Sequence, residues 1–166
     1  MFVALQVVTV MVVAVAMALV VAHVLELPGK MRLSKEEYLA VQPIYYPGFT
    51  IGGIAEPLGL VLLLGLAIAM PIGSAMFWLT TGAFLALAAM HATYWLLTHP
   101  VNNFWLKDAK LTRASAAFFS FGMPAQRDES ASPPWTHLRD QWEFSHIVRA
   151  VLGILSLILL VTAIAM

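Results

Sequence analysis

Long runs of apolar residues divide this chain into hydrophobic segments that alternate with shorter polar stretches. A helix needs about 20 consecutive apolar residues to cross a bilayer core of roughly 30 Å. The pattern predicts four membrane-spanning helices, at about residues 2–26, 54–70, 74–97 and 143–166. We therefore expect one all-α transmembrane domain over residues 1–166, with polar loops at residues 27–53 and 98–142.

The lengths of the connections predict how these helices are arranged. The second and third spans are joined only by Pro71-Ile72-Gly73-Ser74, so they should be antiparallel neighbours. The two long loops then emerge on one side of an up-down-up-down four-helix bundle. Ser34 and Glu37 have the spacing of a capping box, and residues 103–121 mix aromatic with basic side chains. We therefore expect short interfacial helices in both loops.

Charged residues are confined to the side of the two long loops. No Asp, Glu, Lys or Arg occurs before Glu26, between Glu56 and Lys107, or after Arg149. Excess Lys and Arg mark cytoplasmic loops, so we expect both loops in the cytoplasm and both termini outside. The protein should lie in a bacterial inner membrane. No basic residue precedes the first apolar run, which favours a retained helix over a signal peptide.

Composition narrows the classes of partner. Hydrophobic residues make up 61% of the chain and charged residues 11%, which is typical of a membrane protein. The formal net charge is zero, so no nucleic-acid partner is expected. The chain contains no cysteine, which excludes thiolate metal ligands and cysteine nucleophiles. The expected partners are the lipid bilayer and a hydrophobic small molecule, with a homo-oligomer or a larger membrane complex left open.

Ionisable and polar side chains of the spans gather at one membrane depth. They occupy the ends of the first and third spans and the starts of the second and fourth, which the topology places together. Such groups are costly inside a membrane, so they usually face the bundle interior and serve a function. The candidate residues are His23, Glu26, Glu56, His91, Tyr94, Asn102, Glu143, His146 and Arg149.

The spacing within this layer is similar to that of a metal site. Di-iron bundles use Glu-x-x-His pairs on two helices and single carboxylates on the other two. Glu143 and His146 fit that pair, whereas His23 and Glu26 reverse it and His91 departs from it. Imidazole and carboxylate together suit iron, manganese, zinc or copper. We predict one or two metal ions, with iron favoured, bound by His23, Glu26, Glu56, His91, Glu143 and His146.

Two simpler interpretations stay open. The layer is either a metal-free polar pocket or a set of structural pairs, in which Glu26 or Glu56 pairs with Lys30 or Arg149. Arg149 lies deepest in the fourth span and needs a carboxylate partner there. Tryptophan is enriched at membrane interfaces, so interfacial anchoring is expected for Trp95, Trp105, Trp135 and Trp142.

Two motifs resemble those of a known family. Pro100-Val101-Asn102 follows the third span, and Trp135-x-x-Leu138-Arg139-x-x-Trp142-Glu143-x-x-His146-x-x-Arg149 leads into the fourth. With the order of the spans, these motifs resemble the anthrone-oxygenase-like family of small four-helix membrane proteins. The resemblance implies an oxygenase that converts an anthrone methylene to a quinone carbonyl with dioxygen. It carries over four site residues, Asn102, Trp142, His146 and Arg149.

A mechanism follows for such a site. A hydrophobic substrate would enter laterally from the bilayer, and a carboxylate or neutral histidine would remove an activated proton. The carbanion would then react with dioxygen, or a reduced metal would activate dioxygen. Arg149, Asn102 or Tyr94 would stabilise the oxyanion.

Two functions of other classes stay open. One is a non-enzymatic accessory subunit of a larger membrane complex, in which the polar layer is structural. The other is a haem or pigment carrier with axial histidines. A transporter is disfavoured, because there is no inverted repeat and the ionisable groups lie near one face rather than at the midplane.

Overall fold

The computed structural model describes residues 2–46, 48–105 and 134–166, without the side chains of residues 103–105. This part of the chain is helical and contains no strand. Its elements are α1 (Phe2–Lys30), α2 (Lys35–Val41), η1 (Gln42–Tyr45), α3 (Gly48–Gly52), α4 (Ala55–Ile68), α5 (Ala75–Thr93), η2 (Tyr94–Thr98), α6 (His99–Trp105) and α8 (Trp135–Ala165). Most of the amphipathic helix predicted over residues 103–121 falls outside the described residues.

The prediction of an all-helical chain with four candidate membrane spans is confirmed. The segments long and apolar enough to cross a membrane are Phe2–Lys30, Gly48–Ile68, Ala75–Asn102 and Trp135–Ala165. The first helix extends past the expected end at residue 26, and the last begins before the expected start at residue 143. Hydropathy marks the apolar part of a helix, whereas the helical backbone continues into the polar residues that flank it.

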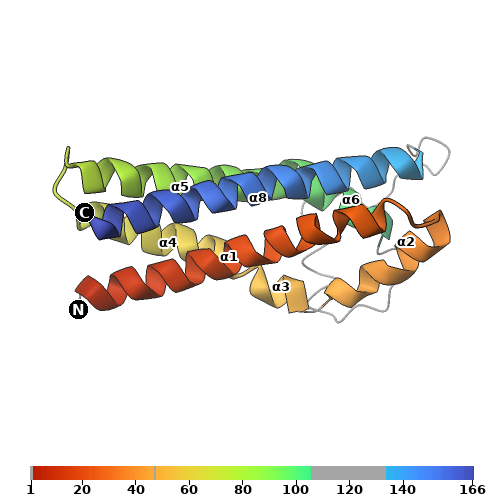
Figure 1. The fold of residues 1–166 in the computed structure, drawn as a ribbon, viewed down its shortest axis with the longest axis horizontal. Helices are drawn as coiled ribbons and strands as arrows, with labels where there is room; N and C mark the ends of the chain where they lie inside the picture. The colour runs from red at the N-terminus through yellow and green to blue at the C-terminus, as the bar shows by residue number, and fades with distance from the viewer. Residues whose placement is uncertain (1, 47, 106–133) are drawn as a thin grey trace.

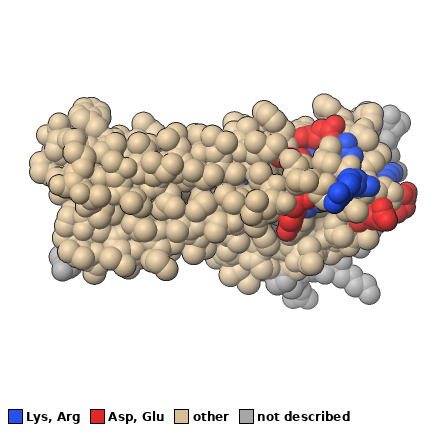
Figure 2. Space-filling view, viewed as in Figure 1, with Lys and Arg blue, Asp and Glu red and all other residues tan. Residues whose placement is uncertain are grey.

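Four long helices pack side by side around one apolar core. α8 packs against α5 and α1, and α4 packs against the same two helices. Figure 1 shows both termini and the α4–α5 turn at one end of the molecule, and α2 and α6 at the other. On the face that Figure 2 shows, charged side chains gather at the end that carries α2. We call this the polar end, where α1 finishes at Lys30 and α8 starts at Trp135.

Glycines allow the helices to approach closely within the core. A Cβ atom on Gly59 of α4 would lie 2.9 Å from Leu87 Cδ2. A Cβ atom on Gly153 of α8 would lie 3.2 Å from Met90 Sδ and 3.3 Å from Met17 Cα. Small residues are enriched at helix interfaces in membranes because they permit such contacts. Gly153 therefore sets the distance of α8 from α1 and α5.

Short helices cover the polar end. The expected helix start at Ser34 is present as a capping box, in which Ser34 and Glu37 each accept the other's backbone N–H. These hydrogen bonds hold the pKa of Glu37 below its usual value. A second apolar cluster, separate from the main core, joins this segment to α6 and α8 through Tyr38, Tyr45, Val101, Leu138 and Trp142.

The second and third spans are both irregular near the polar end. The second is broken, since α3 ends at Gly52 and α4 begins at Ala55. In the third, η2 is a π-helix, and the N–H of His99 bonds to the carbonyl of Tyr94, five residues earlier. Pro100 lacks an N–H and would crowd the carbonyl four residues before it, which a wider turn relieves. Both irregularities leave space inside the bundle.

Substituting Gly153 with valine should destabilise the bundle. The added side chain would overlap Met90 and the backbone of α1 at Met17, and such overpacking costs about 1–3 kcal/mol of unfolding free energy. Gly65→Val is the matched control, because nothing lies within 4 Å of a Cβ at that position. Denaturation in detergent micelles measures both variants. Equal stability of the two would show that α8 does not pack as described.

Candidate functional site

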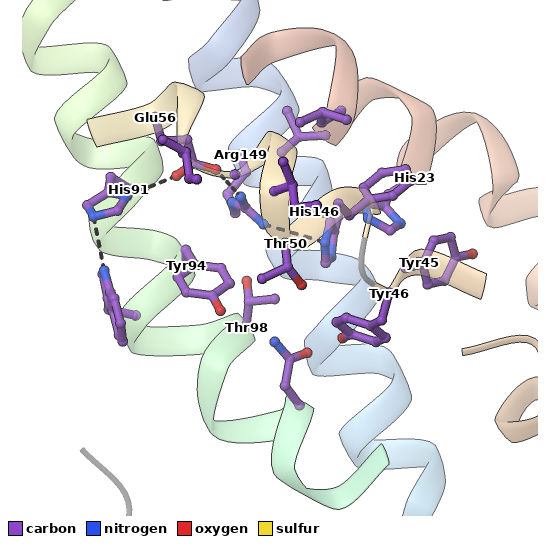
Figure 3. Close-up of a pocket in the computed structure, with 18 of the residues that line it drawn as sticks. His23, Tyr45, Tyr46, Thr50, Glu56, His91, Tyr94, Thr98, His146 and Arg149 are labelled. Atoms are coloured by element: carbon purple, nitrogen blue, oxygen red, sulfur yellow. Dashed lines mark hydrogen bonds and ion pairs between the residues drawn. The ribbon is translucent and has the colours of Figure 1, made fainter. Parts of the chain in front are cut away.

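A cavity of about 790 Å³ lies inside the bundle at the polar end. Figure 3 shows side chains from several helices pointing into it. Small-molecule sites typically enclose roughly 300–1,000 Å³, so the cavity suits a ligand of that class. Of the nine candidate residues that the sequence singled out, all but Glu26 and Glu143 line it. The polar side chains in its wall include His23, Thr50, Glu56, His91, Tyr94, Thr98, Asn102, His146 and Arg149.

Glu56 is held by one partner on each carboxylate oxygen. Arg149 Nη2 donates to Glu56 Oε1, which confirms the expectation that Arg149 pairs with a carboxylate. His91 Nδ1 lies 3.0 Å from Glu56 Oε2. Trp95 Nε1–H donates to His91 Nε2 over 3.0 Å, so the proton of a neutral His91 is on Nδ1. The direction of each hydrogen bond in this row is therefore defined. Trp95 donates to His91, and both His91 and Arg149 donate to Glu56.

His146 presents an unprotonated nitrogen beside Arg149. Its Nδ1 lies 2.8 Å from the carbonyl oxygen of Trp142. A carbonyl oxygen can only accept, so Nδ1 carries the proton and Nε2 carries a lone pair. Arg149 Nη1 donates a long hydrogen bond of 3.5 Å to that Nε2. The guanidinium carbon of Arg149 also lies 5.1 Å from the ring centroid of Tyr94. A base and a cation thus stand side by side in the cavity.

Aromatic rings enclose the two histidines on the α1 side. The ring of His23 lies 4.2 Å from that of His146, between centroids. Tyr45 and Phe49 lie 4.6 Å and 4.7 Å from the His23 ring on the same measure. Lys30 Nζ lies 3.5 Å from His23 Nδ1 and can only donate, so a neutral His23 carries its proton on Nε2.

Lys30 is the centre of a second charged cluster, next to the cavity. Its side chain is buried, with Nζ 3.0 Å from Glu26 and 3.8 Å from Glu143. The expected pairing of Glu26 with Lys30 is therefore confirmed. The ammonium also lies 4.7 Å from the ring centroids of both Tyr45 and Trp142, which adds cation–π attraction. Glu26 and Glu143 are engaged with Lys30 rather than facing the cavity.

Two tyrosines of the covering segment donate to these glutamates. The Tyr38 hydroxyl donates to Glu143 Oε1 over 2.8 Å, and the Tyr45 hydroxyl donates to Glu26 Oε2 over 2.5 Å. Burial, together with the adjacent carboxylates, raises the pKa of both tyrosines well above the usual value, so both stay protonated donors. Sequence reasoning missed these contacts. Tyr38 and Glu143 are 105 residues apart, and no local spacing signals their pairing.

Trp142 does not have the role expected from its place at a helix end. It is 2% exposed, so the prediction of an interfacial anchor is wrong for this residue. Its ring lines the cavity, 4.0 Å from that of His146 between centroids. Its indole N–H donates to Asn102 Oδ1 over 2.9 Å. Trp142 and Asn102 therefore form one hydrogen-bonded wall.

The six predicted metal ligands fall into three pairs. Glu56 and His91 contact each other and pair with Arg149 and Trp95, Glu26 and Glu143 surround Lys30, and the rings of His23 and His146 lie 4.2 Å apart between centroids. Within the described residues, no group of three or more His, Asp or Glu side chains is arranged to hold a metal ion. Cations and tyrosine hydroxyls contact these carboxylates in the structure. Metal binding stays a prediction.

Comparison of the chain with protein-family models, curated proteins and solved structures gives no match. The resemblance to the anthrone-oxygenase-like family therefore stays a prediction based on its two motifs. The four motif residues carried over from it, Asn102, Trp142, His146 and Arg149, all line the same cavity.

The Glu56–Arg149 pair should show strong coupling. Arg149→Leu or Glu56→Leu alone leaves a buried charge without its partner, which costs about 3–5 kcal/mol of unfolding free energy. The double variant should lose much less unfolding free energy than the two single variants lose together, because it leaves no buried charge without its partner. Asp140→Ala, which breaks an exposed pair with Arg139, is the control and should cost about 0–1 kcal/mol. Additive losses at positions 56 and 149 would contradict the pairing.

Proposed function

We propose that this chain is a membrane-embedded oxygenase that acts on a hydrophobic, aromatic substrate in the cavity of the polar end. One observation carries the proposal: the lone pair of His146 Nε2 stands 3.5 Å from the Arg149 guanidinium in an aromatic-walled cavity. Removal of a proton from carbon needs a base, and the resulting negative charge needs a cation nearby. The cavity supplies both.

The location of the protein is part of the same proposal. The chain is an up-down-up-down bundle in a bacterial inner membrane, with the polar end in the cytoplasm and both termini outside. The four apolar helices and the concentration of charge at one end support this arrangement. The short helices α2, η1 and α6 then lie at the cytoplasmic interface.

The first step is removal of a proton from a methylene group that is conjugated with a ketone through aromatic rings, as in anthrone. His146 Nε2 takes the proton, and the electron pair of the broken C–H bond is delocalised through the rings onto the ketone oxygen as an enolate. Arg149 stabilises that oxygen, and its own charge is balanced by Glu56. Apolar walls exclude water and strengthen this interaction.

In the second step the carbanion carbon forms a bond to dioxygen and is oxidised. The peroxide formed takes the proton held by His146 and becomes a hydroperoxide. Loss of the remaining proton on that carbon, with cleavage of the O–O bond, releases water and leaves a carbonyl. One methylene and one dioxygen therefore give one carbonyl and one water, with no external reductant.

The other polar residues hold these groups in place. Glu56 fixes Arg149, and His91 with Trp95 fixes Glu56. Asn102 and Trp142 form the wall behind His146. These are positioning residues in the proposal, because each acts on the reaction through Arg149 or His146.

Replacing His146 should abolish most of the turnover. We expect proteoliposomes supplied with anthrone to form anthraquinone and consume dioxygen in equal amounts, above the rate in protein-free liposomes. Loss of a general base costs roughly 10²–10⁴-fold in rate, so His146→Gln should lower kcat by that factor. His137→Gln is the matched control, because His137 lies exposed on the same helix. Wild-type rates in His146→Gln would refute the base assignment, and no turnover in any variant would favour an accessory subunit.

Metal analysis separates this mechanism from the metal-dependent one. The wild-type protein should keep its turnover after treatment with a chelator, because the proposed steps use only side chains. Mass spectrometry of protein purified without chelators measures bound iron, manganese, copper and zinc. A stoichiometric metal that is lost in Glu143→Ala and His146→Ala would replace the base mechanism with a metal site.

A further inference from the structure

The cavity reaches the molecular surface at the break between α3 and α4. Ile51 and Ile54 both line it and are 65% and 62% exposed. Both belong to the candidate span Gly48–Ile68, so in a bilayer their exposed sides face lipid. Pro57, which follows on α4, is exposed and lines the cavity as well. An opening of the cavity therefore lies on the side of the bundle.

The rim of this opening is apolar even where it contains histidine. The side chain of His91, on α5, is 30% exposed. Both of its ring nitrogens are occupied, Nδ1 by Glu56 and Nε2 by the indole N–H of Trp95. The part of the ring left exposed is thus its carbon edge, which tolerates contact with lipid or an aromatic ligand. Such a rim admits hydrophobic molecules.

Two buried polar atoms inside the cavity wall lack a partner among the described residues. They are Nε of Arg149 and Oγ1 of Thr50. Arg149 as a whole is 6% exposed. Buried donors in proteins are nearly always paired, and both of these groups are able to donate. Figure 3 shows both side chains within the same cavity. A ligand oxygen that accepts hydrogen bonds would satisfy them.

The charges around the cavity disfavour an anionic ligand. Arg149 is balanced by Glu56, and Lys30 faces both Glu26 and Glu143. The layer therefore holds one more carboxylate than fixed cations. A fatty acid or a phosphate would add further negative charge in a region of low dielectric, which is costly.

We propose that the cavity takes its ligand directly from the bilayer through the opening bounded by Ile51, Ile54 and His91. The ligand is an uncharged, lipid-soluble molecule whose oxygen accepts hydrogen bonds from Arg149 Nε and Thr50 Oγ1. This inference rests on the proposed function, because it takes the cavity to be the substrate site. Its tests measure access and binding, not turnover.

Spin labels test the route of access. The chain has no cysteine, so Ile54→Cys and Val61→Cys each introduce a single labelling site. Val61 is the matched control, because it is 68% exposed in the same candidate span but does not line the cavity. In proteoliposomes both labels should be accessible to dioxygen and not to a water-soluble nickel chelate. Anthraquinone should slow the motion of the label at position 54 only. Nickel access at position 54, or equal slowing at both positions, would overturn the proposal.

Binding tests the ligand class. Trp95 and Trp142 line the cavity, so their fluorescence reports on its occupancy. Anthraquinone should bind tighter than anthraquinone-2-sulfonate, its anionic counterpart. Thr50→Val should weaken anthraquinone binding about three- to tenfold, as expected for one lost hydrogen bond. Thr93→Val is the control, since that hydroxyl bonds to the carbonyl of Ala89 and lies outside the cavity.

The outcomes separate this inference from the proposed reaction. Anthraquinone binding with the expected variants, but without turnover of anthrone, would keep the ligand site and refute the oxygenase. Two other outcomes would keep the oxygenase but refute the ligand geometry. In the first, anthrone is turned over but anthraquinone-2-sulfonate binds more tightly than anthraquinone. In the second, anthrone is turned over but Thr50→Val binds anthraquinone with wild-type affinity.

Discussion

The arrangement of the polar end depends on the pairing of Glu56 with Arg149. An arginine stays charged in proteins, and a charge within a span is costly without a counter-ion. The carboxylate has to come from another helix at the same depth, and it comes from the first turn of α4, across the bundle from α8. The second span is broken next to that turn, at Gly53 and Ile54. Gly53 and Ile54 line the cavity together with Glu56 and Arg149, so the ion pair and the break belong to one site.

The second charged cluster holds the covering segment beside the cavity. Lys30 attracts Glu26 and Glu143, and these glutamates in turn accept hydrogen bonds from Tyr45 and Tyr38. The segment that carries the tyrosines is thereby held against α1 and α8. Tyr45 also contributes to the cavity wall. The covering segment thus forms part of the cavity wall, while Ile51 and Ile54 of that wall are exposed on the side of the bundle.

Hydropathy and loop length predicted the helices, and the depth of each polar residue followed from them. Depth identifies a layer but not the direction in which a side chain points. For this reason seven of the nine candidate residues line the cavity, while Glu26 and Glu143 turn to Lys30 instead. The burial of Trp142 was not predicted, because a tryptophan near the end of a span can either face the lipid interface or pack inside the bundle. The π-helix before Pro100 could not be predicted without knowing how η2 packs against α8.

The carboxylates of this layer already contact cationic side chains, with which a bound metal ion would have to compete. A metal ion bound by Glu56 would compete with Arg149, and one bound by Glu26 and Glu143 would compete with Lys30. Displacing either cation leaves it buried without a counter-ion, unless the metal charge is offset elsewhere. In the arrangement described, the Glu56–Arg149 pair places a cation beside Nε2 of His146, whose Nδ1 faces the carbonyl oxygen of Trp142. In the proposed function, this pairing rather than a metal ion supports His146 as the base.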